Sequence, residues 1–507
     1  MPLRVLLVYS NRSLDLLPAP PIGLSYVATA ASHAGHEIAF LDLFPEEHPH
    51  EALRHALHQH RPDVVGISVR NIDSVVHQRL SKHLGELNDL ITLIRGESRA
   101  RIVLGGPAIS ILGSATFSRL DADVAVLGEG EIAFPEVLAT IEHNRPLGGI
   151  NGICFREGEK IITNRPVLLN RFGASGMERW INWPAYERRG GTWTIQSKRG
   201  CPLHCSYCAY PAIEGLGWRR RPAGEVVDEI EHVLHEVRPR AFEFVDSTFN
   251  VPLDNALAIC EEIIRRGLKV NLTAMGINPL TASDTLFSLM KRAGFNSMMI
   301  TPEAANDTIL RNLNKGFTMV HVHRTVQAAR KSGMNSTWFF LLGGPGETRE
   351  TVEETVSFVE QHLNWKNCLS IFMTGIRILP GTDIARQATE EGYLSAQSDL
   401  AEPHFYFSPH VSEELMLNRI NRAVARHPNI VHAAEEGGSS FERLFQQVLY
   451  LLGVAPPYWR FLPAFLRFLP LHALRRRYPS VGGQSQGEAG VTPGCERPRG
   501  PSRHRQD

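Results

Sequence analysis

Short apolar runs alternate with amphipathic helical stretches along most of this 507-residue chain, and this alternation is typical of an α/β fold. In residues 1 to about 145, each strand-length run is followed by a helical pattern, which indicates a doubly wound parallel sheet. The expected strands are Arg4–Tyr9, Glu37–Asp42, Asp63–Val69, Arg101–Leu104 and Ala122–Leu127. Sheets of this kind bind ligands at the carboxyl ends of their strands, so the loops after these strands are candidate sites.

The alternation resumes at Thr192 and continues to about residue 400. The expected strands are Trp193–Lys198, Phe242–Asp246, Lys269–Thr273, Ser297–Thr301, Ser336–Leu342 and Ser370–Ile378. Between the first two, Glu225–Val237 places its apolar side chains on one face of a helix. About six such βα units predict a partial (β/α)6 barrel with its active site at the carboxyl ends of the strands.

These two regions leave three further segments. The expected parts are residues 1–145 as a Rossmann-like domain, 146–190 as a connector, 191–400 as the partial barrel, 401–478 as a helical C-terminal cap, and 479–507 as a disordered tail. The connector contains a hairpin pattern at Gly152–Thr163, and the tail is rich in glycine, proline and polar residues.

One stretch of the C-terminal region resembles a membrane segment. Leu444–Leu452 is largely apolar, but Gly453–Pro457 interrupts it before the roughly 20 residues that a span requires. Tyr458–Arg477 is basic, aromatic and amphipathic, which fits a helix on a membrane surface. We favour instead a cap that packs over the barrel mouth, and we expect no transmembrane segment.

Composition limits the partners of the chain. Lysine plus arginine and aspartate plus glutamate both number 53, so no global field attracts nucleic acid. The apolar run at the N-terminus is too short for a signal peptide and is expected to form a buried strand. Single scattered cysteines fit a reducing compartment, and we expect a cytoplasmic protein.

Cys201, Cys205 and Cys208 form the pattern Cys-x3-Cys-x2-Cys. Three thiolates so close together can hold an iron-sulfur cluster, and a four-iron cluster with three thiolates leaves one iron open to a further ligand. The alternatives are part of a zinc site, which would need a fourth ligand, or a disulfide with a spare thiol. The other cysteines lie singly at positions 154, 260, 368 and 495. The pattern therefore favours an iron-sulfur site.

A cysteine loop after the first strand of a partial barrel resembles the radical SAM superfamily. The resemblance implies that the open iron binds S-adenosylmethionine (SAM) and that an electron, supplied by a donor such as flavodoxin or ferredoxin, cleaves SAM to a 5'-deoxyadenosyl radical. The implied SAM-binding residues are Tyr207 beside the adenine, Asp246 at the amino group, Glu303 at the ribose hydroxyls, and the turn at Gly343 and Gly344. For Glu347 and Thr348 we favour a βα turn and a helix cap.

The first domain resembles the cobalamin-binding domain that precedes many radical SAM barrels. The resemblance rests on Pro20–Tyr26 and on the loops after the third, fourth and fifth strands. The implied cobalamin-binding residues are Gly23, Ser68, Arg70, Asn71, Gly105, Gly106, Gly128, Glu129 and Gly130. No Asp-x-His-x-x-Gly motif is present, so Arg70 is expected to face the lower side of the cobalt without coordinating it. The alternative is a surface arginine at a strand end.

Together the resemblances imply a cobalamin-dependent radical SAM methyltransferase. Such an enzyme moves a methyl group from SAM, by way of methylcobalamin, to a carbon or phosphorus centre of a small-molecule or peptide substrate. The alternatives are a rearrangement or cyclisation without methyl transfer, a radical SAM enzyme whose first domain lacks cobalamin, and a non-catalytic cobalamin sensor. Methylthio transfer is disfavoured because no cysteine precedes Cys154 to hold a second cluster. No catalytic general base is identified.

Overall fold

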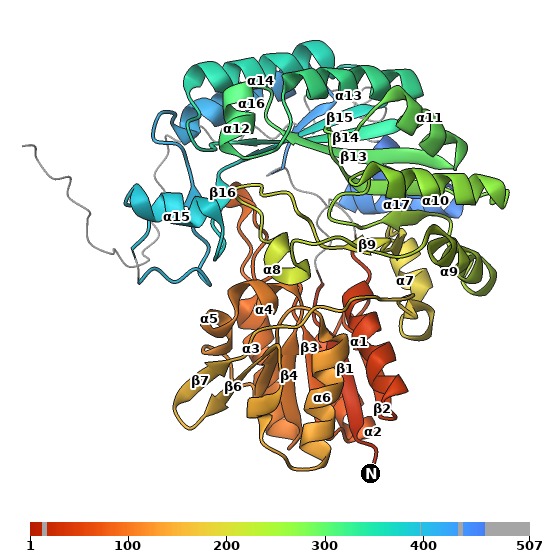
Figure 1. Cartoon of the computed structure of the whole chain (residues 1–507), viewed down its shortest axis with the longest axis vertical. Coiled ribbons are helices and arrows are strands. Elements are labelled where there is room, and N and C mark those ends of the chain that lie inside the picture. The colour runs from red at the N-terminus through yellow and green to blue at the C-terminus, as the bar shows by residue number, and fades with distance from the viewer. Residues whose placement is uncertain (13–17, 396, 434–439, 462–507) are drawn as a thin grey trace, which may run out of the picture. The chain divides into compact units, whose positions relative to one another are not determined.

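In the computed structural model, the N-terminal sheet has the strand order β2-β1-β3-β4-β5-β6-β7 (Figure 1). Its parallel strands are β1 (Arg4–Tyr9), β2 (Glu37–Asp42), β3 (Val64–Ser68), β4 (Arg101–Gly105) and β5 (Val124–Val126). All five expected strands are present, with ends within two residues of those expected. β1 and β3 are almost entirely buried, as the two-sided burial of a parallel sheet requires.

The expected hairpin is also present, as β6 (Ile153–Glu157) and β7 (Lys160–Thr163). It continues the N-terminal sheet, because β6 pairs antiparallel with β5 and satisfies the backbone groups of what would be an open edge. The sheet therefore extends beyond residue 145 into the expected connector. The rest of the connector holds the short helices η3 (Met177–Arg179) and α7 (Trp183–Glu187).

Helices connect the parallel strands of the N-terminal sheet and contribute to two apolar cores. They are α1 (Ile22–His33), α2 (Pro49–His60), η1 (His77–Arg79), α3 (Leu84–Glu97), α4 (Pro107–Leu112), α5 (Ser114–Phe117), α6 (Gly130–Glu142) and η2 (Leu147–Gly149). The carboxyl ends of the strands carry the loops that the sequence marks for a ligand.

The second sheet has the order β18-β15-β14-β13-β12-β11-β8, with every neighbouring pair parallel. The strands are β8 (Trp193–Ile195), β11 (Phe242–Phe244), β12 (Leu272–Ile277), β13 (Phe295–Glu303), β14 (Asn335–Leu342), β15 (Cys368–Thr374) and β18 (Ile430–His432). The helices are α9 (Ala223–Glu236), α10 (Leu253–Arg265), α11 (Asp284–Arg292), α12 (Asp307–Asn312), α13 (Met319–Ser332), α14 (Arg349–His362) and α15 (Asp383–Glu390). β8 and β18 do not pair with each other, so the barrel is open, as expected.

Alternation along the barrel strands separates an apolar face from a polar one. Phe242 and Phe244 pack in the core with the helices, so Glu243 between them points to the inner face of the barrel. Its neighbours in register are Thr194 and Thr273. Burial raises the pKa of Glu243 to about 7, although the Thr192 hydroxyl donates to it at 2.9 Å. The interior of the barrel is thus polar at this level.

The structure describes residues 1–12, 18–395, 397–433 and 440–461, which lie within one compact unit, Met1–Phe468. The region after residue 400 was expected to be helical and does contain α16 (Glu413–Arg426), α17 (Ser440–Leu451) and η4 (Tyr458–Phe461). It also supplies β18, and β17 (Phe405–Tyr406), which pairs with β16 (Ile376–Arg377). The tail expected at 479–507 lies outside the described residues.

The C-terminal region packs on the connector at one point that the structure describes. Tyr458 is buried, and a Cβ on Gly190 would lie 2.9 Å from its ring. Tyr458 therefore packs in the protein interior, as expected for a cap rather than for a membrane-surface helix. Most of the basic aromatic stretch, from residue 462 onward, lies outside the described residues. No helix within the described ranges is long and apolar enough to span a bilayer.

A buried ion pair joins the loop after β3 to β16, which follows the barrel strand β15 in the chain. The Arg377 guanidinium contacts the Asp73 carboxylate at 3.0 Å, and each side chain is only 4% exposed. Arg377 also donates to the carbonyl oxygens of Ile378 and Leu400. Both charges are therefore removed from water and depend on each other.

We expect Asp73→Asn to lower the free energy of unfolding by about 3–5 kcal/mol, because it leaves the buried Arg377 charge unpaired. Asp121→Asn is the matched control, since Asp121 pairs with Arg95 at 3.1 Å but its side chain is 77% exposed. We expect the control to cost at most about 1 kcal/mol. Urea unfolding followed by circular dichroism measures both, and equal losses would contradict the buried pair.

Candidate active site

The cysteine loop leaves β8 through the short strand β9 (Lys198–Arg199), which pairs antiparallel with β10 (Arg219–Arg220). The loop and the short helix α8 (Tyr210–Glu214) lie between β9 and β10. Gly200 has φ +86°, and a Cβ there would lie 2.0 Å from the carbonyl oxygen of Gly217. Only glycine fits this position, which directly precedes Cys201.

The three cysteines lie close enough to influence one another. Cys201 is buried, and Cys205 and Cys208 are half-buried. Burial, together with the charges of Cys205 and Cys201, raises the pKa of Cys208 to about 11. In the described residues no three Cys, His, Asp or Glu side chains converge on a single metal ion. A four-iron cluster instead takes each thiolate at a different iron, so these three thiols fit a cluster better than one ion.

Asp246 holds the strand that enters the cysteine loop. Its Oδ1 accepts from the backbone N–H groups of Ser197 and Lys198 at 2.7 and 3.1 Å. Its Oδ2 accepts from the Ser197 hydroxyl at 2.5 Å and from Lys198 Nζ at 3.4 Å. These bonds use the four acceptor sites of a carboxylate. Contact between Asp246 and the SAM amino group stays a prediction, while the geometry gives this residue a supporting role.

Tyr207 and Glu303 meet in the structure. The Tyr207 hydroxyl donates to Glu303 Oε1 at 2.9 Å, and Lys315 Nζ lies 3.0 Å from that hydroxyl and 3.5 Å from the carboxylate. Burial, and next the Glu303 charge, raises the pKa of Tyr207 well above its usual value. Glu303 ends β13 with φ +70°, a strained conformation of the kind that clusters at functional sites. No motif or periodicity marks Lys315, which lies in the loop between α12 and α13.

The turn at Gly343 and Gly344 is closed by Glu347. The Glu347 carboxylate accepts from the two glycine N–H groups at 2.5 and 3.0 Å, and the Thr348 hydroxyl caps α14. The expected turn and cap are therefore present. Since Glu347 occupies both N–H groups, a contact of Gly343 or Gly344 with SAM stays a prediction that would use other atoms of the turn.

The predicted cobalamin residues gather at the carboxyl edge of the N-terminal sheet. Ser68 ends β3, and Arg70 and Asn71 follow with exposed side chains. Arg70 makes no hydrogen bond or ion pair with the described residues, which leaves its charge available to a ligand. Around a Cβ on Gly23 there is no atom within 4 Å, and for Gly105 the nearest atoms are 4.0 Å away. This open edge fits a large ligand.

The other glycines of this edge are needed for packing of the chain on itself. A Cβ on Gly106, which has φ +99°, would lie 2.6 Å from the Val69 carbonyl oxygen. On Gly130 it would lie 2.8 Å from Val27, and on Gly128, with φ +73°, 3.1 Å from Pro166. Their backbones border the open edge, and contact with cobalamin stays a prediction.

Glu129 points away from the role expected of it. Its side chain is 5% exposed and pairs with Arg219 at 2.6 Å and Arg199 at 3.4 Å, both in the β9–β10 hairpin. Its Oε2 also accepts from the Leu169 N–H at 2.7 Å. The carboxylate is therefore engaged with the barrel side, and only its backbone is left for cobalamin. The sequence motifs did not predict a role for Arg199 or Arg219, because the residues around them are typical of any basic strand.

Tyr210 connects the two sites. It opens α8 directly after the cysteine loop, and α8 contacts α4, which begins after Gly106. Burial raises the pKa of Tyr210 to about 12, while the charges of Arg70 and Cys208 also reach its hydroxyl. Its residue surface is nevertheless 46% exposed. Tyr210 is thus partly open to solvent, on a helix that contacts α4.

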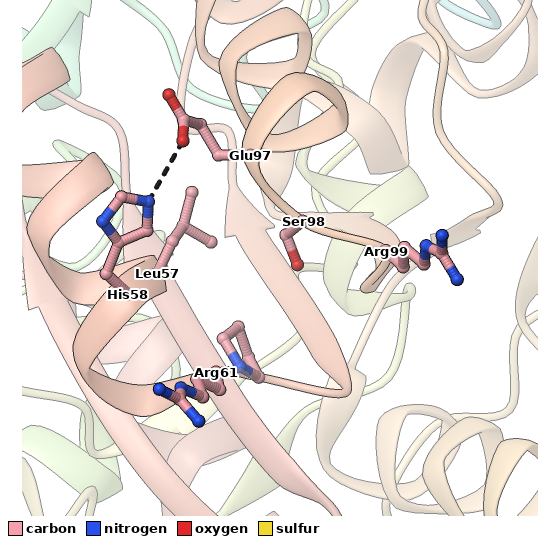
Figure 2. Close-up of a pocket in the computed structure, with 7 residues that line it drawn as sticks. Leu57, His58, Arg61, Glu97, Ser98 and Arg99 are labelled. Carbon is pink, nitrogen blue, oxygen red and sulfur yellow. Dashed lines mark hydrogen bonds and ion pairs between the residues drawn. The ribbon is translucent and has the colours of Figure 1, made fainter.

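A separate cavity of about 500 Å³ lies at the opposite edge of the N-terminal sheet (Figure 2). Its lining residues, Leu57, His58, Arg61, Pro62, Glu97, Ser98 and Arg99, lie at or just after the ends of α2 and α3. Glu97 joins His58 at 3.0 Å and accepts from Arg54 at 2.9 Å. Basic side chains such as His58 and Arg61 complement the dipole at the carboxyl end of a helix. We therefore assign the charged residues that line this cavity a structural role.

Comparison with known proteins matches both halves of the chain. Residues 16–138 match the B12 binding domain family and residues 195–359 the radical SAM superfamily. An uncharacterized methyltransferase of Pyrococcus horikoshii is 26% identical over 68% of this chain and 73% of its own length. The cytidylyl-2-hydroxyethylphosphonate methyltransferase of Streptomyces wedmorensis is 24% identical over 75% of this chain and 80% of its own length.

The fold also matches a solved structure. The radical SAM methyltransferase TsrM of Kitasatospora setae, with cobalamin and a [4Fe-4S] cluster bound, superposes with a TM-score of 0.78. The two chains are 22% identical, and the match covers 92% of this chain and 99% of the other. The two chains therefore share the fold of an N-terminal sheet followed by an open barrel.

We expect Gly200→Ala to lose the cluster, because the added Cβ collides with the Gly217 carbonyl and must displace the strand before Cys201. Gly217→Ala is the matched control, since a Cβ there meets no atom within 4 Å. After anaerobic reconstitution, we expect Gly200→Ala to hold less than about half of the roughly four irons per chain found in the control. Full iron content in Gly200→Ala would contradict the close fit.

Proposed function

This chain belongs to the cobalamin-binding radical SAM enzymes, and we propose that it methylates a carbon or phosphorus centre of a small-molecule or peptide substrate. The observation that carries the proposal is the contact between α8, which directly follows the cysteine loop, and α4, which follows the Gly105–Gly106 loop of the N-terminal sheet. The segment that follows the cysteine loop therefore lies against the carboxyl edge of the N-terminal sheet. When bound, the cluster supplies an electron to SAM and cobalamin carries the methyl group.

The cysteines and their neighbours would hold the first two cofactors. Cys201, Cys205 and Cys208 would bind the cluster, and Gly200 and Asp246 fix the strand that leads to them. Tyr207 and Lys315 both bond to Oε1 of Glu303. No other described residue bonds to Oε2, so this oxygen can accept from the ribose hydroxyls of SAM.

Arg70 would lie on the lower side of cobalamin. It follows β3 at the open edge, and its guanidinium is free of partners among the described residues. An arginine stays protonated at all ordinary pH values and has no lone pair to give to cobalt. It would therefore exclude water and other ligands from that side while leaving the metal without a protein ligand.

Two further points belong to the proposal. Reduction of the cluster requires a one-electron donor, for which a flavodoxin or ferredoxin is the expected partner. A cluster with an open iron is sensitive to oxygen, which favours a reducing compartment such as the cytoplasm.

Methyl transfer is tested with SAM labelled at its methyl group. We expect the protein, purified anaerobically with cobalamin, to hold about four irons and one cobalt per chain and to pass the label to bound cobalamin. The triple substitution of Cys201, Cys205 and Cys208 by alanine should abolish the cluster absorbance. Formation of 5'-deoxyadenosine from SAM, with no label on cobalamin or on any product, would favour a rearrangement or cyclisation instead.

The position of Arg70 is tested by spectroscopy. We expect Arg70→Ala to change the electron paramagnetic resonance spectrum of bound cob(II)alamin, because water can then reach the lower side of the cobalt. Arg61→Ala is the control, since Arg61 is exposed at the opposite edge of the same sheet. Identical spectra for Arg70→Ala and the unmodified protein would remove Arg70 from the cobalamin site.

A further inference from the structure

Four buried charges connect the loop after β5 to the hairpin that encloses the cysteine loop. Glu129 and Glu131 lie at the start of α6, and Arg199 and Arg219 lie opposite each other in β9 and β10. Their side chains are between 5% and 14% exposed. We call these four residues the carboxylate–arginine clamp.

The clamp is continuous. Arg199 Nη2 contacts Glu131 at 2.7 Å, and Arg199 Nη1 contacts Glu129 at 3.4 Å. Arg219 Nη1 contacts the same Glu129 carboxylate at 2.6 Å. Two negative and two positive charges therefore balance within one network, and each arginine is held by at least one carboxylate of the N-terminal sheet.

Aromatic rings fix the Arg199 guanidinium in place. Its central carbon lies 4.6 Å from the ring centroid of Tyr26, on α1, and 4.3 Å from that of Phe172, in the connector. A planar cation held between rings and a carboxylate has one orientation, which a lysine ammonium would not reproduce. The position of Arg199 is therefore set by α1, the connector and α6 together.

The barrel side of the clamp leads directly to the cluster ligands. Arg199 is followed by Gly200 and Cys201, and the Gly200 N–H donates to Glu214 at 3.1 Å. Arg219 Nη2 donates to the Glu214 carbonyl at 2.5 Å, and the Cys201 N–H donates to the Gly215 carbonyl at 3.0 Å. A shift of either arginine would therefore move the first cysteine and the end of α8.

The other side of the clamp borders the open edge of the N-terminal sheet. Glu129 lies between Gly128 and Gly130, whose backbones bound that edge. Its carboxylate points to the hairpin while its backbone stays at the edge. Glu129 thus contacts the β9–β10 hairpin through its side chain, while its main chain lies at the predicted cobalamin site.

Folding stability alone is a poor explanation for this arrangement. Removing four charges from water is costly, and well-packed apolar side chains can replace buried ion pairs with no loss of stability. What charged pairs add is a defined direction, because a guanidinium and a carboxylate bond in few geometries.

We propose that Glu129, Glu131, Arg199 and Arg219 are positioning residues that fix the cobalamin edge relative to the cysteine loop and so couple the binding of cobalamin to the presence of the cluster. The inference rests on the proposed function in one respect, that cobalamin occupies the open edge. Because coupling between two sites is reciprocal, loading the cysteine loop tightens cobalamin binding, and cobalamin stabilises the loaded loop.

The test compares the dissociation constant of cobalamin for cluster-loaded and cluster-free protein, measured anaerobically by the change in cobalamin absorbance. We expect loaded protein to bind about 5- to 150-fold more tightly, the usual range of coupling between sites. In Glu131→Gln, which removes the carboxylate nearest Arg199, the ratio should fall toward one. Glu97→Gln is the matched control, since Glu97 pairs with Arg54 and His58 at the opposite edge.

A second variant guards against loss of folding in the first. Arg199→Lys keeps the charge but loses the forked contact and the flat surface between the rings, so the ratio should be reduced. The spin–spin interaction between the reduced cluster and cob(II)alamin gives a structural readout, and in Arg199→Lys we expect a broader spread of distances. A folded Arg199→Lys with an unchanged ratio and spectrum would overturn the clamp. Failure of the unmodified protein to bind cobalamin would instead overturn the proposed function.

Discussion

The site depends on one desolvated carboxylate. Asp246 lies just after β11, the strand next to β8, and accepts four hydrogen bonds, all from Ser197 and Lys198. A buried carboxylate is tolerated only when it is paired and hydrogen-bonded, and here the partners are the residues that lead to the cysteines. Gly200 adds the second constraint, because the hairpin approaches it too closely for any side chain. The loop that carries the three thiols is thus anchored at its start by β8 and by the residues that follow β11.

Both sheets place their candidate ligand-binding residues at the carboxyl ends of their parallel strands. Each presents the carboxyl ends of its strands, where loops are free to carry polar groups and where glycines permit close approach. In the first sheet these ends leave Arg70 and Asn71 exposed, and in the barrel they bring Tyr207, Glu303 and Lys315 together. The buried Asp73–Arg377 pair and the carboxylate–arginine clamp tie the two edges at separate points. These contacts hold the loops of the two sheets together while the strands of each sheet keep their own pairing.

Much of the fold followed from the sequence because apolar runs of strand length are a strong signal in parallel sheets, where strands are buried on both faces. β18 was missed since three residues after an amphipathic helix carry no periodicity, and its place in the sheet is set by pairing with β15. The three cysteines were identifiable because their spacing is rare. Lys315, Arg199 and Arg219 were not, since a buried cation is recognised by its distant partners rather than by its neighbours in the chain. Glu129 is the opposite case. Its motif predicted a contact with the ligand, but its side chain pairs with Arg199 and Arg219, which are distant in the sequence.

The tyrosines on either side of Cys208 in the sequence, Tyr207 and Tyr210, lie in different surroundings. Tyr207, before it, turns into the barrel and bonds to Glu303, in a buried group that includes a fixed cation. Tyr210, two residues after it, lies within reach of the Arg70 charge at the other sheet. The Tyr207 hydroxyl therefore lies beside a buried carboxylate, whereas Tyr210 is partly exposed to solvent. A loop this short leaves little room for independent movement. In the proposed function, SAM on the barrel side and cobalamin at the edge of the N-terminal sheet are therefore held at a nearly fixed separation. Transfer between them then depends on how firmly the loop is held, which is the property that Asp246, Gly200 and the clamp control.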